Sequence, residues 1–164
     1  MENKEQKFEQ IYEQSKDKVY RLCLGFMGNK TDADDLFQEV LIKVWNNLDT
    51  FRNESNIDTW VYRITTNTAL LTLNKRNKLN KKEIVYQPKT LHYEMENSNS
   101  NEKEREVKEL YKAISLLKEI DRIIIGLLLE NCSYYDISSI TGLKISNVGV
   151  RINRIKKTLS KKLK

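Results

Sequence analysis

Apolar residues recur at spacings of three and four along most of the chain, which is typical of amphipathic helices. The pattern predicts a first helix, or a broken pair, over about residues 8–26. A second helix is expected to run to Leu48 with Thr31 as its N-cap, and a third to begin near residue 58 or 59 and continue past Leu73. Only one Pro and five Gly occur in 164 residues, so the predicted fold class is all-α.

The helical pattern is interrupted between residues 83 and 105. This stretch contains Pro88 and a polar run without apolar periodicity, so it cannot bury a side and is expected to be a flexible linker. The helical spacing returns from Val107. We therefore predict two small helical domains: residues 1–82, then the linker at 83–105, then residues 106–164 with a helix-turn-helix.

Residues 133–152 have the spacing of that helix-turn-helix. Ser133 can cap its first helix, Gly142 lies where the turn requires positive φ, and Leu143 is placed to fill the angle between the helices. The second helix has one narrow apolar stripe, made of Val148, Ile152, Ile155 and Leu159. A helical hairpin with a basic tail is the alternative interpretation.

The rest of the second helix carries side chains suited to a DNA groove. The candidates for duplex contacts are Lys144, Ser146, Asn147, Gly149, Val150, Arg151, Asn153, Arg154 and Lys157. A glycine inside a helix costs about 1 kcal/mol relative to alanine, and close approach of a DNA backbone would explain Gly149. Val150 lies on the polar face, where it could meet a thymine methyl group.

Two surfaces of the N-terminal domain are also candidates for binding. On the second helix, Asp35, Gln38 and Glu39 surround Ile42, as in a small protein-docking patch with an apolar centre and a polar rim. A solvated face with one stray apolar residue is the alternative. On the third helix, Trp60 shares the face of Ile64, which favours a core position, whereas Tyr62 and Arg63 point elsewhere.

The loop over residues 51–57 is rich in Asn and Ser and could hold an unstacked base by hydrogen bonds to its edge. Tyr62 is the better candidate of the two third-helix aromatics for base stacking.

Charge and composition favour an anionic partner. The net charge is +6, the pI is near 9.2, and no acidic residue occurs from 144 to 164. The basic cluster at residues 75–82 belongs either to such a partner or to a solvated face. Cys23 and Cys132 form no CxxC pair, so we expect buried, reduced thiols and neither a disulfide framework nor a zinc site.

Other classes of function find little support in the sequence. There is no nucleophile triad, metal-ligand spacing or Gly-rich phosphate loop, so we expect no enzyme, metal or cofactor. His92, the single histidine, falls in the linker and is interpreted as a bystander. No signal core or membrane-length apolar run is present, so the expected location is the cytoplasm without membrane insertion.

Several motifs together resemble one protein family. Residues 34–40 read Asp-Asp-Leu-Phe-Gln-Glu-Val, residues 51–55 Phe-Arg-Asn-Glu-Ser, and residues 59–67 Thr-Trp-Val-Tyr-Arg-Ile-Thr-Thr-Asn. With the helix-turn-helix, they are similar to bacterial sigma factors of the extracytoplasmic-function (ECF) type, the smallest members of the sigma-70 family. The resemblance covers about residues 8–79 and 110–163. It implies a first domain that docks on the clamp helices of core RNA polymerase and captures the melted −10 strand, and a second that reads the duplex −35 element.

The resemblance also assigns roles to residues by position. By this resemblance, Asp35, Gln38 and Glu39 are expected to dock on the polymerase, with Ile42 on the same face. The −10 strand falls to Phe51, Arg52, Asn53, Ser55, Trp60, Tyr62, Arg63 and Asn67, and the −35 duplex to the helix candidates named above. The linker would run toward the RNA exit path. Many relatives have a basic and a small polar residue at 149 and 150, and a glycine at 53, so the −35 preference and the loop conformation do not carry over.

The expected function is therefore a sigma factor that directs core RNA polymerase to promoters and promotes DNA melting. An anti-sigma factor is a further expected partner, since many relatives are held inactive by one. A stand-alone helix-turn-helix regulator that binds operator DNA is the alternative, but it would not need the acidic face or the base-capturing loop. A nucleic-acid-processing enzyme is the weaker rival.

Overall fold

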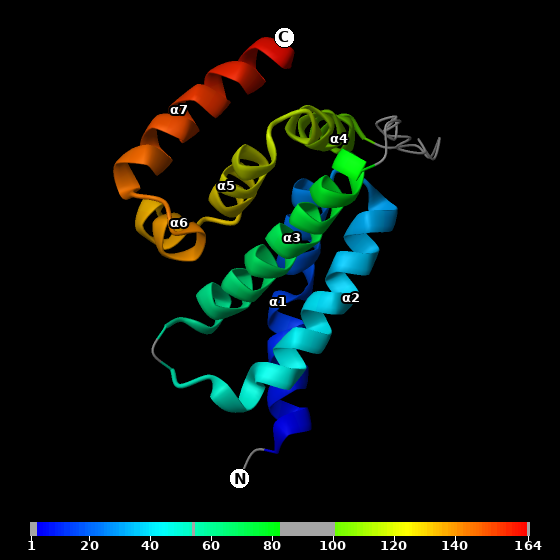
Figure 1. Ribbon diagram of the computed structural model, residues 1–164, viewed down its shortest axis with the longest axis vertical. Helices are drawn as coiled ribbons and strands as arrows, with labels where there is room; N and C mark the ends of the chain where they lie inside the picture. Colours follow the sequence, from blue (N-terminus) through cyan, green and yellow to red (C-terminus); the bar gives the residue numbers. More distant parts are fainter. Residues whose placement is uncertain (1–2, 54, 83–100, 164) are drawn as a thin grey trace.

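The computed structural model describes residues 3–53, 55–82 and 101–163, and these residues form helices and no strand (Figure 1). The N-terminal domain contains α1 (Lys4–Met27), α2 (Lys30–Asn47), the short 3-10 helix η1 (Leu48–Thr50) and α3 (Ile57–Lys82). The C-terminal domain contains α4 (Glu102–Ser115), α5 (Glu119–Leu129), α6 (Tyr134–Thr141) and α7 (Ile145–Lys162). The all-α prediction and the helix-turn-helix, α6 and α7, are confirmed.

Local sequence signals explain where α1 ends and α2 begins. Gly28 closes α1 with φ 83°, a left-handed conformation that costs glycine little. Asn29 follows at once as the N-cap of α2, and its side-chain oxygen accepts a hydrogen bond from the Asp32 amide at 2.9 Å. The prediction that Thr31 caps this helix was wrong, because α2 has already begun at Lys30.

The first helix after the expected linker, α4, begins at Glu102, within the stretch that the sequence assigned to that linker. Asn101 caps α4, and residues 102–105, which were expected to end the linker, form its first turn. Glu102 and Glu104 lie in that turn, where the helix dipole favours acidic side chains. Residues 83–100 of the expected linker, including His92, lie outside the described residues.

Helix α1 is the centre of the packing. It contacts α2 and α3 within its own domain and α4 and α5 of the other domain, so the buried side chains of both domains form one continuous cluster. Phe26, Leu22, Leu36, Ile123 and Ile152 are among its largest fully buried members. The two domains are thus packed on each other, an arrangement that the sequence did not predict.

Two helices stay outside this contact between domains. Among the described elements, α2 packs on α1, α3 and η1, and α7 packs on α4, α5 and α6. They lie on opposite sides of the molecule (Figure 1). Within the residues that the structure describes, no helix is long and apolar enough to span a membrane.

Both cysteine thiols are buried and free, as expected. Burial raises the pKa of Cys23 to about 12 and that of Cys132 to about 12. Both thiols are therefore protonated near neutral pH and are weak nucleophiles.

Candidate functional site

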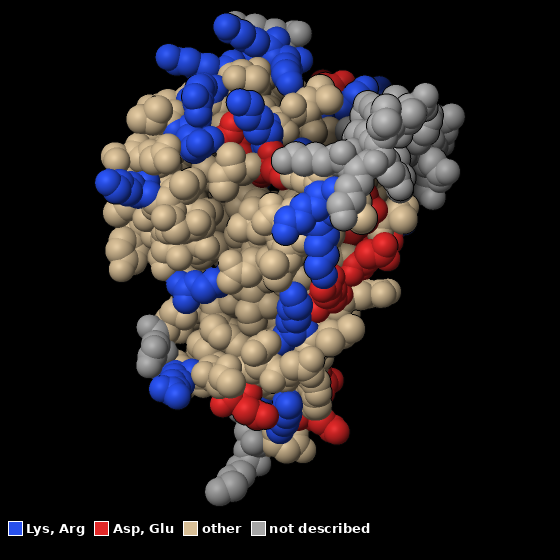
Figure 2. Space-filling view, in the orientation of Figure 1, with Lys and Arg blue, Asp and Glu red and all other residues tan. Residues whose placement is uncertain are grey.

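A row of exposed side chains runs along α2. Asp35, Gln38, Glu39 and Ile42 are all exposed, with Ile42 at 60%. Their spacing of three and four residues puts them on one face of the helix. Acidic side chains appear on the side of the molecule where α2 lies (Figure 2). The four residues named from the sequence therefore form one accessible surface, the α2 row.

The neighbouring acids have structural roles instead. Asp32 is buried and accepts hydrogen bonds from both terminal nitrogens of Arg76, at 2.8 and 2.9 Å, and from the Asn29 amide group at 2.7 Å. Asp34 accepts one from the Tyr20 hydroxyl at 2.7 Å. The acidic cluster thus splits into an inner pair that holds helices together and an outer part in the α2 row. Arg76, a member of the basic cluster at 75–82, belongs to the inner network.

The loop between η1 and α3 is held by short-range contacts. The centres of the Phe51 and Trp60 rings lie 5.0 Å apart, and the Lys7 ammonium lies 5.8 Å from the centre of the Phe51 ring. Asn53 has φ 56°, the left-handed region. Asparagine tolerates this backbone conformation better than most residues with a side chain.

Asn56 is a residue of this loop that the sequence analysis missed. Its side-chain oxygen accepts a hydrogen bond from the Asp58 amide, and its backbone carbonyl accepts one from the Trp60 amide, each at 3.1 Å. Asn56 therefore caps α3 and fixes where the loop ends. The available signal was an asparagine directly before the helix and two residues before Asp58, the acidic residue of its first turn.

The remaining −10 candidates fall into two groups. Arg52, Asn53 and Asn67 are exposed, and Phe51, Ser55 and Trp60 are half-buried. Trp60 and Asn67 line an open groove of about 230 Å³ between α2 and α3, together with Lys43, Asn47, Thr50, Ile64 and Thr68. This first group is accessible.

Tyr62 and Arg63 form the second group, and they face the C-terminal domain. Tyr62 is only 4% exposed, although the sequence favoured it over Trp60 as an exposed stacking side chain. Half-buried Arg63 donates a hydrogen bond to the Ser139 hydroxyl of α6 at 2.8 Å. A helical face says which residues point the same way, but not that another domain covers them.

The helix-turn-helix has the predicted local geometry. Ser133 caps α6 in a reciprocal capping box with Asp136, and Gly142 closes the helix at φ 79°. The stripe of α7 is buried as predicted, with Val148, Ile152, Ile155 and Leu159 each at most 7% exposed. Helix α7 is thus fixed by one face and presents the other.

Most of the duplex candidates lie on that outer face. Six polar or basic side chains and one apolar one are exposed: Lys144, Ser146, Asn147, Asn153, Arg154, Lys157 and Val150, the last at 64%. Arg151 differs, since it pairs with Asp121 of α5 at 3.1 Å and also donates to Asn147 at 3.2 Å. Gly149 is half-buried beside the Tyr134 ring of α6. Lys and Arg side chains gather at the end of the molecule where α7 ends (Figure 2).

Fold and surfaces together define a class of protein. A helix-turn-helix with a basic outer face is an element that enters a DNA groove, and the first domain adds an acidic docking row and an accessible aromatic loop. This combination is that of a two-domain DNA-binding transcription factor. Among the described residues, no group of His, Cys, Asp and Glu side chains could hold a metal ion.

Comparisons with known proteins identify the family. The sigma-70 region 2 family matches residues 11–79, and the sigma-70 region 4 family matches residues 108–159. The ECF RNA polymerase sigma factor SigW of Bacillus subtilis is 27% identical over 96% of this chain and 89% of its own length. The RNA polymerase sigma factor SigV of the same organism is 28% identical over 88% of this chain and 83% of its own. The chain belongs to the ECF type of the sigma-70 family.

Solved structures agree with this fold. The sigma factor RpoE of Bartonella quintana, crystallised with the anti-sigma factor NepR, matches with a TM-score of 0.78 at 22% identity, over 96% of both chains. CnrH, solved with the cytosolic domain of CnrY, matches with a TM-score of 0.63 at 19% identity, over 93% of this chain and 84% of its own. A stand-alone operator-binding regulator, the alternative from the sequence, does not account for the region 2 match.

Proposed function

We propose that this sigma factor binds core RNA polymerase through the α2 row, directs the enzyme to promoters through α7, and promotes melting through the loop and the start of α3. The observation that carries the proposal is the exposure of the α2 row beside the buried, internally paired Asp32. Within this row Glu39 pairs with Lys43 of the same helix at 3.8 Å, a solvent-exposed contact that adds little stability, so the acids stay accessible to a partner. The row suits a basic, partly apolar partner surface.

The −10 strand is assigned to the aromatic loop and α3. Phe51 and Trp60 offer half-buried aromatic rings, and Arg52, Asn53, Ser55 and Asn67 offer donors and acceptors around them. Aromatic rings bind unstacked bases of any sequence, while the polar groups can read a base edge. Tyr62 and Arg63 complete the same surface once the C-terminal domain moves away.

The −35 duplex is assigned to the outer face of α7. Val150 supplies an apolar contact for a thymine methyl, and Asn147 and Asn153 can pair with base edges in the major groove. The basic side chains, Lys144, Arg154 and Lys157, bind phosphates and set the register. Because Arg151 is paired with Asp121, its contribution to DNA binding is smaller than the sequence suggests.

The proposed setting follows from these partners. The chain acts without catalytic groups of its own, since the polymerase performs the chemistry, and it works in the cytoplasm where the polymerase is. An anti-sigma factor is a proposed further partner, because the sigma factor RpoE of similar fold has been crystallised with the anti-sigma factor NepR, and CnrH has been solved with the cytosolic domain of CnrY. The division into domains at residues 1–82, 83–105 and 106–164 is kept as a proposal, with α4 beginning at Glu102.

Transcription with purified core polymerase, on a fragment library of the genome that encodes the chain, tests the proposal. The chain should yield transcripts from discrete start sites, and the double reversal Asp35→Lys/Glu39→Lys should abolish both transcription and polymerase binding. The matched control is Glu9→Lys/Glu13→Lys, which reverses two exposed acids of α1 and should leave both intact. Unchanged polymerase binding by the α2 double variant would refute the docking assignment.

A further inference from the structure

The C-terminal domain covers part of the proposed strand surface. Tyr62 is 4% exposed on α3, a helix that packs against α5 and α6. The pKa of its hydroxyl is raised first by burial and then by the negative charges of Asp58 and Glu130. Glu130 lies in the connection between α5 and α6. A base cannot stack on this ring while that connection lies against it.

Arg63, the next residue, is engaged by the same domain. One terminal nitrogen of its guanidinium donates to the Ser139 hydroxyl of α6 at 2.8 Å. A strand phosphate would need donors on this same side chain. Two neighbouring residues of the strand surface are therefore held by the domain that carries the helix-turn-helix.

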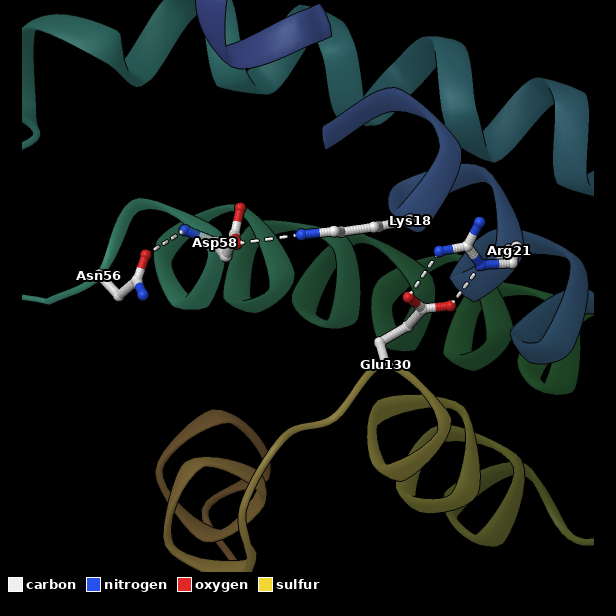
Figure 3. A network of polar contacts seen from close by, with 5 residues as sticks. All are labelled: Lys18, Arg21, Asn56, Asp58 and Glu130. Atoms are coloured by element: carbon white, nitrogen blue, oxygen red, sulfur yellow. Dashed lines mark hydrogen bonds and ion pairs between the residues drawn. The ribbon is translucent and has the colours of Figure 1, made fainter. Parts of the chain in front are cut away.

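An ion pair joins the two domains (Figure 3). Arg21 of α1 donates two hydrogen bonds to the Glu130 carboxylate, at 2.6 and 2.9 Å. The Glu130 side chain is 8% exposed and that of Arg21 46%. Alongside, Lys18 pairs with Asp58 at 3.4 Å and ties α1 to the start of α3. Glu130 thus places a carboxylate next to the strand surface, where it would also repel a phosphate.

Two further contacts close the same interface. The Arg122 side chain of α5 donates to the Phe26 carbonyl at 3.0 Å, which satisfies a carbonyl at the end of α1 and puts a cation there. Gly126 of α5 lies so near the Phe26 ring that an added Cβ would be only 2.9 Å from it. The close approach of α5 to α1 therefore depends on a residue without a side chain.

We propose that this packing is a strand-excluding state, in which the C-terminal domain and the −10 single strand compete for Tyr62 and Arg63, with the Arg21–Glu130 pair setting the closed fraction. The inference rests on the proposed function, since it takes these residues as strand-binding. The apparent affinity for a strand then equals the intrinsic affinity reduced by the open fraction. Any change that weakens the interface without touching the strand surface should strengthen strand binding.

The test uses two variants of the full chain that open the interface by different means. Glu130→Ala removes the ion pair, and Gly126→Ala adds a methyl group against Phe26 without changing the charge. The matched control is Glu13→Ala, which breaks the exposed Lys16–Glu13 pair within α1 with the same charge change. Small-angle X-ray scattering measures the radius of gyration, and fluorescence anisotropy measures affinity for a labelled single-stranded DNA of random sequence.

Both opening variants should show a larger radius of gyration. Glu130→Ala should bind the strand about fivefold more tightly than the parent, because a half-exposed ion pair lies at the low end of coupling strengths. Gly126→Ala should also bind it more tightly. The control should match the parent in both measurements. The gain should vanish in Glu130→Ala/Tyr62→Ala, and Arg21→Glu/Glu130→Arg should restore the compact form by re-forming the pair.

Contrary results are equally clear. If folded Glu130→Ala and Gly126→Ala keep the parent's radius of gyration, the Arg21–Glu130 ion pair does not set the closed fraction, and the proposal is wrong. If they expand but bind the strand no better, closure does not hide the strand surface, and the proposal is wrong. Promoter-dependent transcription by the parent chain is scored separately, so that a failure of the sigma-factor function and a failure of the closed state give different results.

Discussion

Replacing Gly149 with alanine should stabilise the protein, although the residue lies within the helix proposed to read DNA. Glycine inside a helix costs about 1 kcal/mol relative to alanine. An added Cβ would lie 3.7 Å from the Tyr134 ring, an ordinary van der Waals distance, so no clash offsets the gain. For a chain of this size, about 1 kcal/mol corresponds to a rise in Tm of roughly 2–4 °C. Thermal unfolding followed by circular dichroism measures it.

Gly142→Ala is the matched control, since it makes the same chemical change seven residues earlier in the same motif, at the C-cap of α6. Gly142 has φ 79° and no atom within 4 Å of an added Cβ. Space is therefore available, but the left-handed backbone costs a residue with a Cβ about 1–2 kcal/mol. The two substitutions should shift the Tm in opposite directions. A destabilising Gly149→Ala, or a stabilising Gly142→Ala, would refute the reasoning from contact distance and φ.

The same variant tests the hypothesis that Gly149 admits a DNA backbone. Gly149→Ala should then be more stable than the parent and yet bind promoter duplex more weakly in an anisotropy titration, because the methyl group would occupy the space of the approaching backbone. If duplex affinity is unchanged while stability rises, Gly149 has no role in the approach of DNA. Neither the Tyr134 ring nor a DNA backbone would then explain why a glycine stands at this position.

Three further predictions concern the inner network, the aromatic segment and the thiols. Asp32→Ala should lower the free energy of unfolding, measured in urea, by about 2 kcal/mol, because it removes the partner of the partly exposed Arg76. A change below about 0.5 kcal/mol, the level of an ordinary surface substitution, would contradict the structural role of Asp32. Tyr62→Ala should impair open-complex formation, read by permanganate footprinting, more than polymerase binding, since base stacking is worth about 1–3 kcal/mol; equal losses would make Tyr62 purely structural. Burial raises the pKa of Cys23 and of Cys132 from 9.0 to about 12, so unfolded thiols ionise first and stability should fall as pH rises from 9 to 12. In Cys23→Ala, the free energy of unfolding measured in urea should fall less steeply between pH 9 and pH 12. An unchanged slope would contradict the assignment of this pH dependence to the buried thiol.

Much of the local structure could be predicted because its causes are local. The stripe of α7, the Ser133 cap and the positive φ at Gly142 each depend on residues within a few positions. The error at Thr31 is also local: Gly28 ends α1 in a left-handed conformation, and the next residue, Asn29, is itself a strong N-cap. Two capping residues stood two positions apart, and the sequence alone did not rank them.

The errors about accessibility have a different cause. Tyr62 was expected to be open because its helical face differs from that of Trp60, but it is buried on a helix that packs against α5 and α6, which are far along the chain. Similarly, Asp32 and Asp35 belong to one acidic run, and only the position of Arg76 divides them into buried and exposed. No periodicity within a helix reports which of its faces a distant segment will meet.

The closed arrangement distributes the cost of opening unevenly among the three proposed partners. Among the helices that the structure describes, α2 and α7 contact those of their own domains alone, so neither polymerase docking nor duplex reading requires the interface between the domains to break. Strand capture does, because Tyr62 and Arg63 lie within that interface. A partner that binds both domains farther apart than the closed form allows would open the chain with its own binding energy. On these proposals, polymerase and promoter duplex bind first, and the strand surface becomes complete only when a melted strand is at hand.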